Sequence, residues 1–236
     1  MKHAPNIPVD EPVRPLENET RRRLVEAGML LFGLHGLDAT TTRELARQAG
    51  ANLAAIPYHF GGKEGLYRAV LEHIVRIKRE EIAPCLDRLR AVCEDAASGR
   101  ETLLQALREG VRGLVTAMLD SPQSRSCTQI MLQEQIAPTD GFGIIHDNFL
   151  VHIHAALNAL LHRLLDLPEG SLELHLHTMS LMGQMFIFRV GMPSLLALVG
   201  EDRLSQAHVA AIVAVCARQA EALAAGFAPT AGRSGP

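Results

Sequence analysis

The chain has 236 residues, 47% of them hydrophobic, with four Cys, no Trp and a formal net charge of -3. This composition favours helices around a substantial core, and the widely spaced Cys residues are expected to be buried free thiols rather than metal ligands. No apolar run approaches the roughly eighteen residues of a membrane span, and the first residues lack a signal-peptide pattern. We therefore expect a cytosolic protein with no membrane partner.

Charge is unevenly distributed along the chain. Residues 18–79 contain ten Lys and Arg against six Asp and Glu, whereas residues 80–236 contain eleven against seventeen. A basic N-terminal third before an acidic remainder suits a DNA-reading head on a body that does not touch DNA. The Arg run at 21–23 either contacts phosphate or forms a solvated face.

The first elements predicted along the chain are an arm, a helix and a helix pair. Residues 1–17 are rich in Pro and lack apolar periodicity, which predicts a disordered arm. A helix should run from Asn18 to about residue 35 and end at Gly36. Two short helices follow within residues 41–60, joined by a tight turn at Gly50, with Asn52 able to cap the second. This is a helix-turn-helix, whose second helix is shaped to enter a DNA major groove.

The rest of the chain is also predicted to be helical. A helix over residues 63–79 would link head and body and can transmit a tilt, and Pro84 is expected to mark a boundary after it. Further helices are predicted over residues 85–97, 101–119, 123–136, 142–165, 172–190, 195–199 and 205–225. The predicted fold is all-α, with a DNA-binding domain at 18–78, a helical body at 79–226 and a disordered tail at 227–236.

Two stretches carry a family signature. The run from Ala39 to Ala46, then Ala49-Gly50, then Tyr58 to Tyr67 resembles the DNA-binding domain of TetR-type transcriptional regulators. This motif is specific, because its turn, cap, core and phosphate-contact positions all agree. In the body, residues 131–139 and 182–189 resemble the CecR-like subgroup of that family.

The resemblance implies a set of DNA contacts across the motif. Thr42 and Arg43 match positions near the DNA backbone and neighbouring bases, and a hydroxyl, a guanidinium and a helix N-terminus all suit phosphate. Base hydrogen bonds would come from Asn52 or Arg43, because the leading recognition positions are apolar and can pack on a thymine methyl. Tyr58 is implied to contact phosphate, with a role as cover for the small core as the alternative. The full implied set is Thr41, Thr42, Arg43, Asn52, Leu53, Ala54, Ala55, Tyr58, His59 and Lys63.

One position departs from the family pattern. Pro57 stands where the family usually places Tyr, and if Asn52 caps the helix, this proline removes a backbone hydrogen bond to Leu53. Such a proline costs about 3 kcal/mol in a helix interior. The recognition helix is therefore either kinked there or begins later than the motif suggests. Sequence reading should lean on few hydrogen bonds, apolar contacts and DNA shape.

For the body, the resemblance implies a homodimer with a small-molecule effector. Helices 142–165 and 172–190 of two subunits would form a four-helix interface through Phe149, Leu157, Leu161, Leu164, Leu181, Met182 and Phe186. Met and Phe side chains could also line an adaptable pocket, although core filling is their more frequent role. The candidate pocket residues are Met118, Gln129, Gln133, Glu134, Phe142, Met185 and Arg189. The implied protein is a repressor that binds a palindromic double-stranded DNA operator and is released by an inducer.

Two other classes of function compete with this one. Six of the eleven His residues fall within residues 146–177, which suggests a metal sensor, but two pairs of them are only two residues apart and point away from each other on a helix. His154 and His162 do share a face, so a metal-responsive regulator stays an alternative. An enzyme is disfavoured, because the chain has no nucleophile elbow, phosphate loop, dinucleotide fingerprint or zinc-protease motif, and no cofactor is expected.

Overall fold

The computed structural model describes residues 19–120 and 124–226, and every regular element within them is a helix. In chain order these are α1 (Glu19–Ala39), α2 (Thr42–Gln48), α3 (Ala55–Phe60), α4 (Lys63–Glu94), α5 (Arg100–Leu119), α6 (Ser124–Ile136), α7 (Phe142–Ile145), the π-helical turn η1 (His146–Leu150), α8 (Val151–Leu165), α9 (Leu172–Val190), α10 (Met192–Val199) and α11 (Gln206–Gly226). The expected arm and tail lie outside the described residues.

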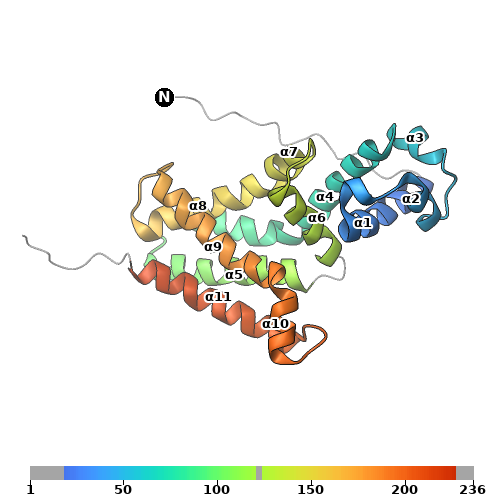
Figure 1. The fold of residues 1–236 in the computed structure, drawn as a ribbon. Coiled ribbons are helices and arrows are strands. Elements are labelled where there is room, and N and C mark those ends of the chain that lie inside the picture. Colours follow the sequence, from blue (N-terminus) through green and yellow to red (C-terminus); the bar gives the residue numbers. More distant parts are fainter. Residues whose placement is uncertain (1–18, 121–123, 227–236) are drawn as a thin grey trace, which may run out of the picture.

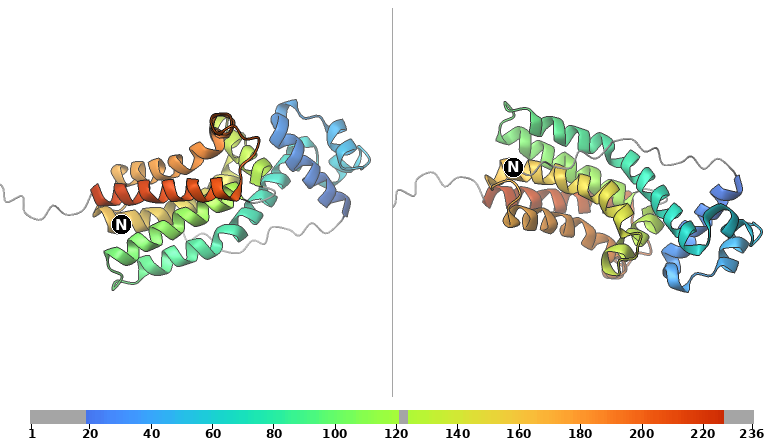
Figure 2. Two further views of the ribbon diagram at one scale, coloured as in Figure 1. Left: turned by 90° about the horizontal axis from the view of Figure 1, so that it is seen from below. Right: turned by 90° about the horizontal axis from the view of Figure 1, so that it is seen from above.

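The helices form a head and a body. The head consists of α1, α2, α3 and the start of α4, and it lies at one end of an elongated molecule (Figure 1). The body is a bundle in which α4, α5, α8, α9 and α11 run side by side, and α6 lies between that bundle and the head. Views from two further directions keep the head at the end of the bundle (Figure 2).

The turns predicted at two glycines are confirmed. Gly36 has a φ of 79° and interrupts α1, and Gly50 has a φ of 58° between α2 and α3. Left-handed backbone of this kind favours Gly because it has no Cβ. These turns set the course of the chain through the head.

The linking helix is longer than the sequence predicts. α4 continues through Pro84 to Glu94, so the expected boundary at Pro84 and the separate helix over 85–97 are wrong. Pro84 is exposed, and the carbonyl that its missing N–H leaves unpaired can bond water on that side. Cys85 and Leu89 are buried on the opposite side, where they pack on α5. A single helix therefore runs from the head deep into the body.

One described helix passes a length and composition test for crossing a membrane. This helix is α11, with a mean hydropathy of 1.4, and α9 with α10 would pass as a pair despite the 61° bend between them. α11 packs along α5, where Arg108 pairs with Glu221 and Arg100 Nη2 donates to the carbonyl O of Ala224 at 2.6 Å. The buried residues of α11 are Val209, Ile212, Val213, Cys216, Ala220 and Ala224, and its other apolar side chains are half-buried or exposed.

Candidate nucleic-acid interface and internal cavity

Local hydrogen bonds shape the helix-turn-helix. The backbone N–H of Glu44 donates to Thr41 Oγ1 at 3.2 Å, and the backbone N–H of Thr41 donates to Glu44 Oε2 at 3.0 Å. This reciprocal pair is a capping box that starts α2 at Thr42. Asn52 Oδ1 accepts from the backbone N–H of Ala54 at 2.9 Å and so shapes the turn before α3. The expected cap by Asn52 is wrong, because the N-cap of α3 is Ala54 and has no side-chain cap. The turn leaves the amide N–H groups of Asn52 available to a base.

Pro57 is accommodated because the recognition helix begins late. α3 starts at Ala55, which makes Pro57 its third residue. The carbonyl of Leu53 accepts instead from the N–H of Ile56 at 3.3 Å. The first N–H groups of a helix have no partner within it, so a proline in the first turn removes nothing. Of the two outcomes that the sequence allows, the later start holds.

The implied DNA contacts form an exposed edge. Arg43, Asn52, Leu53 and Ala54 are exposed, and Tyr58 is 83% exposed. The alternative role of Tyr58 as a cover for the small core is therefore wrong. The tip of this edge is apolar and its flanks carry a guanidinium, an amide and a phenol.

The remaining members of the set lie close to this edge with their side chains partly engaged. Thr42, Ala55 and His59 are half-buried, and His59 packs edge-on against the Tyr58 ring with centroids 4.8 Å apart. Lys63 Nζ donates to the carbonyl O of Leu37 at 2.9 Å. Lys63 thus ties the start of α4 to the end of α1, and this bond would compete with any phosphate contact.

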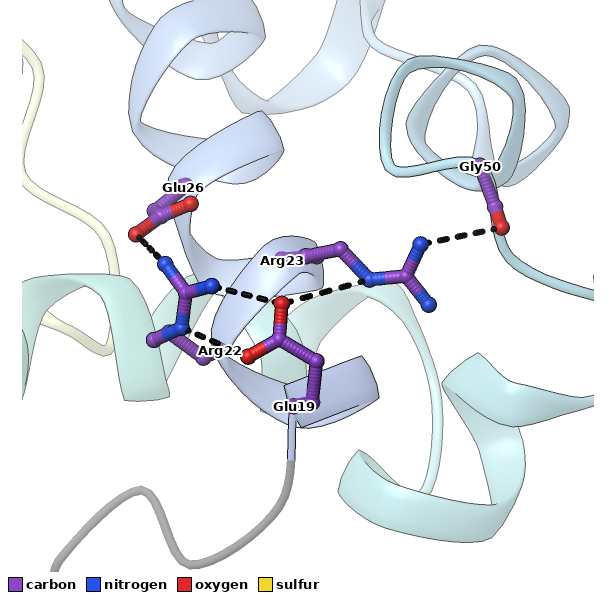
Figure 3. Close-up of polar contacts among 5 residues, drawn as sticks. All are labelled: Glu19, Arg22, Arg23, Glu26 and Gly50. Atoms are coloured by element: carbon purple, nitrogen blue, oxygen red, sulfur yellow. Dashed lines mark hydrogen bonds and ion pairs between the residues drawn. The ribbon is translucent and has the colours of Figure 1, made fainter.

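The three arginines of α1 have separate roles, and Figure 3 shows the contacts of Arg22 and Arg23. Arg22 lies between Glu19 and Glu26, with N–O distances of 2.6 Å to each, so it belongs to a solvated ion-pair network. Arg23 Nη1 reaches the carbonyl O of Gly50 at 3.4 Å and braces the turn between α2 and α3. Arg21 lies over the Phe60 ring, with its guanidinium carbon 5.2 Å from the ring centroid.

Comparison with known proteins decides the family. Residues 24–70 match the family model for bacterial regulatory proteins of the tetR family, and residues 103–227 match the C-terminal domain of the HTH-type transcriptional dual regulator CecR. The chain is 30% identical to CecR of Shigella flexneri over 197 residues, which are 81% of this chain and 86% of that protein. The chain belongs to the TetR family. This TetR-family protein is a DNA-binding transcriptional regulator of the CecR-like type.

Solved structures agree on the fold of this TetR-family regulator. The TetR-family regulator PfmR from Thermus thermophilus matches with a TM-score of 0.56 at 16% identity, covering 87% of this chain and 99% of that chain. A TetR-like regulator from a Rhodococcus species matches with a TM-score of 0.55 at 15% identity, covering 88% and 96%. The relatives and the fold are those of regulators, so the enzyme alternative is rejected.

The body of this regulator encloses an apolar cavity. Its volume is about 60 Å³, and it is partly open to solvent. The walls come from α4, α5, α6, η1, α8 and α9, and the lining residues are Lys78, Ile82, Leu114, Ala117, Met118, Thr128, Met131, Phe149, Ile153, Met182, Met185 and Phe186. A partly open, almost wholly apolar space inside a helical bundle is a candidate small-molecule site.

The cavity differs from the pocket expected from the sequence. Met118 and Met185 line it, whereas Gln129, Gln133, Glu134, Phe142 and Arg189 lie elsewhere. Gln129 is exposed, and Phe142 stacks on His146 with ring centroids 5.3 Å apart. Arg189 is partly buried outside the walls, where burial and the nearby Arg125 lower its pKa. The helical periodicity of the sequence places these residues on or next to helices that wall the cavity, but their side chains do not line it.

The expected dimer contacts are also corrected. Six of the seven residues are buried within their own chain, namely Phe149, Leu157, Leu161, Leu164, Leu181 and Met182. Phe186 is half-buried and lines the cavity together with Phe149 and Met182. A side chain that is buried in its own subunit has no surface to offer a partner, so the six buried residues cannot form the interface.

A different face of α9 carries an exposed apolar stripe. Successive members are four, three, four, four and three residues apart, so they fall on one side of the helix. Five of them are large apolar residues that are more than half exposed, and Gly183 lies among them. The stripe consists of Leu172, Leu176, Met179, Gly183, Ile187 and Val190. The sequence of α9 is consistent with this stripe, because its apolar residues cover more than one face of the helix.

A buried carboxylate joins head to body. Glu134 of α6 is 1% exposed and accepts from Tyr67 Oη at 2.7 Å, from the backbone N–H of Thr139 at 3.1 Å and from Thr139 Oγ1 at 2.8 Å. Tyr67 lies on α4, and its ring packs edge-on against Phe32 of α1. Burial and the bond to Glu134 raise the pKa of Tyr67. The expected role of Glu134 in the pocket gives way to one in this joint.

The two tyrosines of the chain allow a matched test of this joint. We expect Tyr67→Phe to lower the free energy of unfolding by about 1–3 kcal/mol, because a buried carboxylate loses a hydrogen-bond donor. Urea denaturation followed by far-UV circular dichroism measures the change. Tyr58→Phe is the control and should have almost no effect, since the Tyr58 ring is exposed. Equal effects of the two substitutions would contradict the assignment.

The histidines of the body make pairwise contacts. His154 Nε2 lies 2.9 Å from Met179 Sδ, His175 Nδ1 lies 3.0 Å from Asn158 Nδ2, and His162 Nδ1 lies 2.6 Å from the carbonyl O of Leu167. Within residues 19–120 and 124–226, no group of three or more His, Cys, Asp or Glu side chains is arranged to hold a metal ion. Nothing here favours the metal-responsive alternative.

Proposed function

We propose that this regulator is a homodimeric repressor that binds a palindromic operator and is released by a small-molecule effector. The proposal rests on one combination: an exposed recognition edge at one end of α4 and an apolar cavity walled by the middle of the same helix. Its CecR relative is named a dual regulator, and the repressor role proposed here is the simplest action of an operator-bound dimer. Its place of action would be the cytoplasm, as expected of a DNA-binding regulator of this family. Residues 18–78 would read DNA, and residues 79–226 would bind the effector and the second subunit.

The homodimer would form through the exposed stripe of α9 with the outer face of α8. An apolar stripe of this length on a helix is unfavourable in water and is covered by an identical stripe in a two-fold pair. The two-fold would place the recognition helices about 34–36 Å apart, one turn of DNA. A palindromic operator follows from that symmetry.

Two helices support communication between cavity and head. α4 contributes Lys78 and Ile82 to the cavity and Tyr67 to the joint. α6 contributes Thr128 and Met131 to the cavity and Glu134 to the joint. An effector that binds more tightly to a form with displaced α4 and α6 would shift the population away from the operator-binding form. Equal affinity for both forms would change nothing.

The phosphate role of Arg43 is tested by salt dependence. We expect Arg43→Ala to weaken operator binding and to reduce the slope of log affinity against log salt by about one, because one phosphate is no longer neutralised. Gel-shift titrations at several salt concentrations, with DNA from upstream of the gene, measure both quantities. Arg22→Ala is the control, since Arg22 is held between two glutamates. An unchanged slope for Arg43→Ala would exclude this docking.

A further inference from the structure

Two histidines lie at the seam between α8 and α9, beside the exposed apolar stripe of α9. His175 falls between Leu172 and Met179 in the helical repeat and contacts Asn158 of α8, so it lies on the edge of the stripe that faces α8. His154 of α8 reaches the stripe itself, because its Nε2 lies 2.9 Å from Met179 Sδ. The centroids of the two imidazole rings are 6.3 Å apart. A second subunit that covers the stripe would therefore meet both rings.

A chain of hydrogen bonds holds His175 in its neutral form. The buried Thr178 donates its hydroxyl to Asn158 Oδ1, which leaves the amide nitrogen of Asn158 to face His175. Asn158 Nδ2 lies 3.0 Å from His175 Nδ1. An amide nitrogen only donates, so Nδ1 must accept and carries no proton. Protonation of His175 would set two donors against each other, because both ring nitrogens of an imidazolium carry N–H groups.

The surroundings of His154 also favour its neutral form. Burial lowers the pKa of His154, and the nearby His175 and His146 lower it further. The thioether sulfur of Met179, which lies against its Nε2, is a weak acceptor without a negative charge. A proton on His154 would therefore gain little from its immediate contacts.

The acidic groups of the neighbouring elements do not compensate such a proton. Asp147 of η1 is bonded to His146, with 2.7 Å between its Oδ1 and the imidazole Nδ1. On α9, Glu173 lies 4.0 Å from His177, and both fall on the side of the helix opposite the seam. Within the part of the chain that the structure describes, no carboxylate raises the pKa of His154.

The cations of the other helices that pack on α8 lie away from the seam. Arg79 and Arg90 of α4 act on His152, which is two residues before His154 and so points to another side of α8. Arg100 of α5 donates to the carbonyl O of Leu164, near the end of α8, at 2.8 Å. The charge state of the seam is therefore set by its own histidines.

We infer that the dimer interface is a proton-sensitive switch, in which His154 and His175 must be neutral for two subunits to associate through the α9 stripe. This rests on the proposed function in one respect, that the stripe is the dimer interface. Covering the stripe removes water from both rings, so the dimer binds protons less tightly at these sites than the monomer does. By linkage, association is strongest above the ordinary histidine pKa of about 6.5 and weakens as the pH falls below it.

Sedimentation of the full-length protein at several pH values tests the inference. We expect the dissociation constant of the dimer to rise by about tenfold or more between about pH 7.5 and about pH 5.5. The double variant of His154→Gln with His175→Asn should remove this dependence, because the amides place polar atoms near Nε2 and Nδ1 but bind no proton. Each single variant should keep about half of the dependence on a logarithmic scale, so the test stands even if the double variant fails to dimerise.

His152→Gln is the matched control, since it removes a histidine of the same helix that lies near α4, and it should keep the full dependence. Far-UV circular dichroism at each pH reports whether the subunits remain folded. A dimer whose dissociation constant does not change with pH would overturn the switch and leave the proposed homodimer intact. Wild-type pH dependence in both single variants would also overturn it, because other groups would then be responsible. A protein that stays monomeric at every pH would reject the proposed homodimer, and the switch with it.

Discussion

Gly65→Ala is expected to lower operator affinity by about a hundredfold, although Ala is the better helix former. A Cβ at residue 65 would lie 1.8 Å from the carbonyl O of Phe60 and 2.9 Å from its carbonyl C. Both are backbone atoms at the end of α3, so no side-chain rotation can relieve the overlap. The recognition helix must move relative to α4, and each base that it then fails to reach costs about 1–3 kcal/mol of binding free energy.

The sign of this effect separates packing from helix propensity. In an open helical position, Gly to Ala stabilises by up to about 1 kcal/mol. Gly143→Ala provides that control, because Gly143 is exposed and a Cβ there would meet only an Asp147 carboxylate oxygen at 3.7 Å. Operator titrations and melting curves of the two variants make the comparison. Native operator affinity in Gly65→Ala would show that α3 does not need its present position against α4.

Met179→Glu is expected to convert the proposed dimer into monomers. Met179 lies in the middle of the α9 stripe and is 54% exposed in the single chain. In a two-fold interface the substitution occurs twice, and it places two carboxylates close to each other in an apolar contact, each near His154 of its own chain. Burying these like charges should cost about 3 kcal/mol or more, so the dissociation constant of the dimer should rise by about a hundredfold or more.

Sedimentation velocity measures this change, and operator binding should fall with it. Leu198→Glu is the matched control, because Leu198 is 84% exposed on α10 and lies outside the stripe. A monomer from both variants would extend the interface to α10. A dimer that survives Met179→Glu with native stability would exclude the stripe as the interface.

The helix-turn-helix could be read from the sequence because its signals are local. The capping box of Thr41 and Glu44, the left-handed Gly50 and the side-chain hydrogen bond of Asn52 in the turn each act within a few residues of the chain. Such signals depend only on neighbouring residues and not on contacts between distant segments. The sequence also identified the family and the all-helical body.

Local sequence signals alone did not determine where the recognition helix starts. Pro57 allowed either a kink or a late start, and only the path of the backbone through Leu53 and Ala54 decided between them. Pro84 is a second such case, because a proline in a helix interior usually breaks or kinks the helix. Pro84 is tolerated here because it and Glu80, whose carbonyl loses its intrahelical partner, lie on the exposed side of α4, while Cys85 and Leu89 pack against α5 on the opposite side.

The sequence by itself determined which helices exist and where the DNA-reading motif lies. Only the tertiary structure decided what each helical face meets. Periodicity shows that a face is apolar, but burial of Leu181 and exposure of Met179 depend on which helices pack beside α9. The same holds for Lys78 in the cavity wall and Glu134 in the joint, because their partners are brought close by packing between helices far apart in the chain.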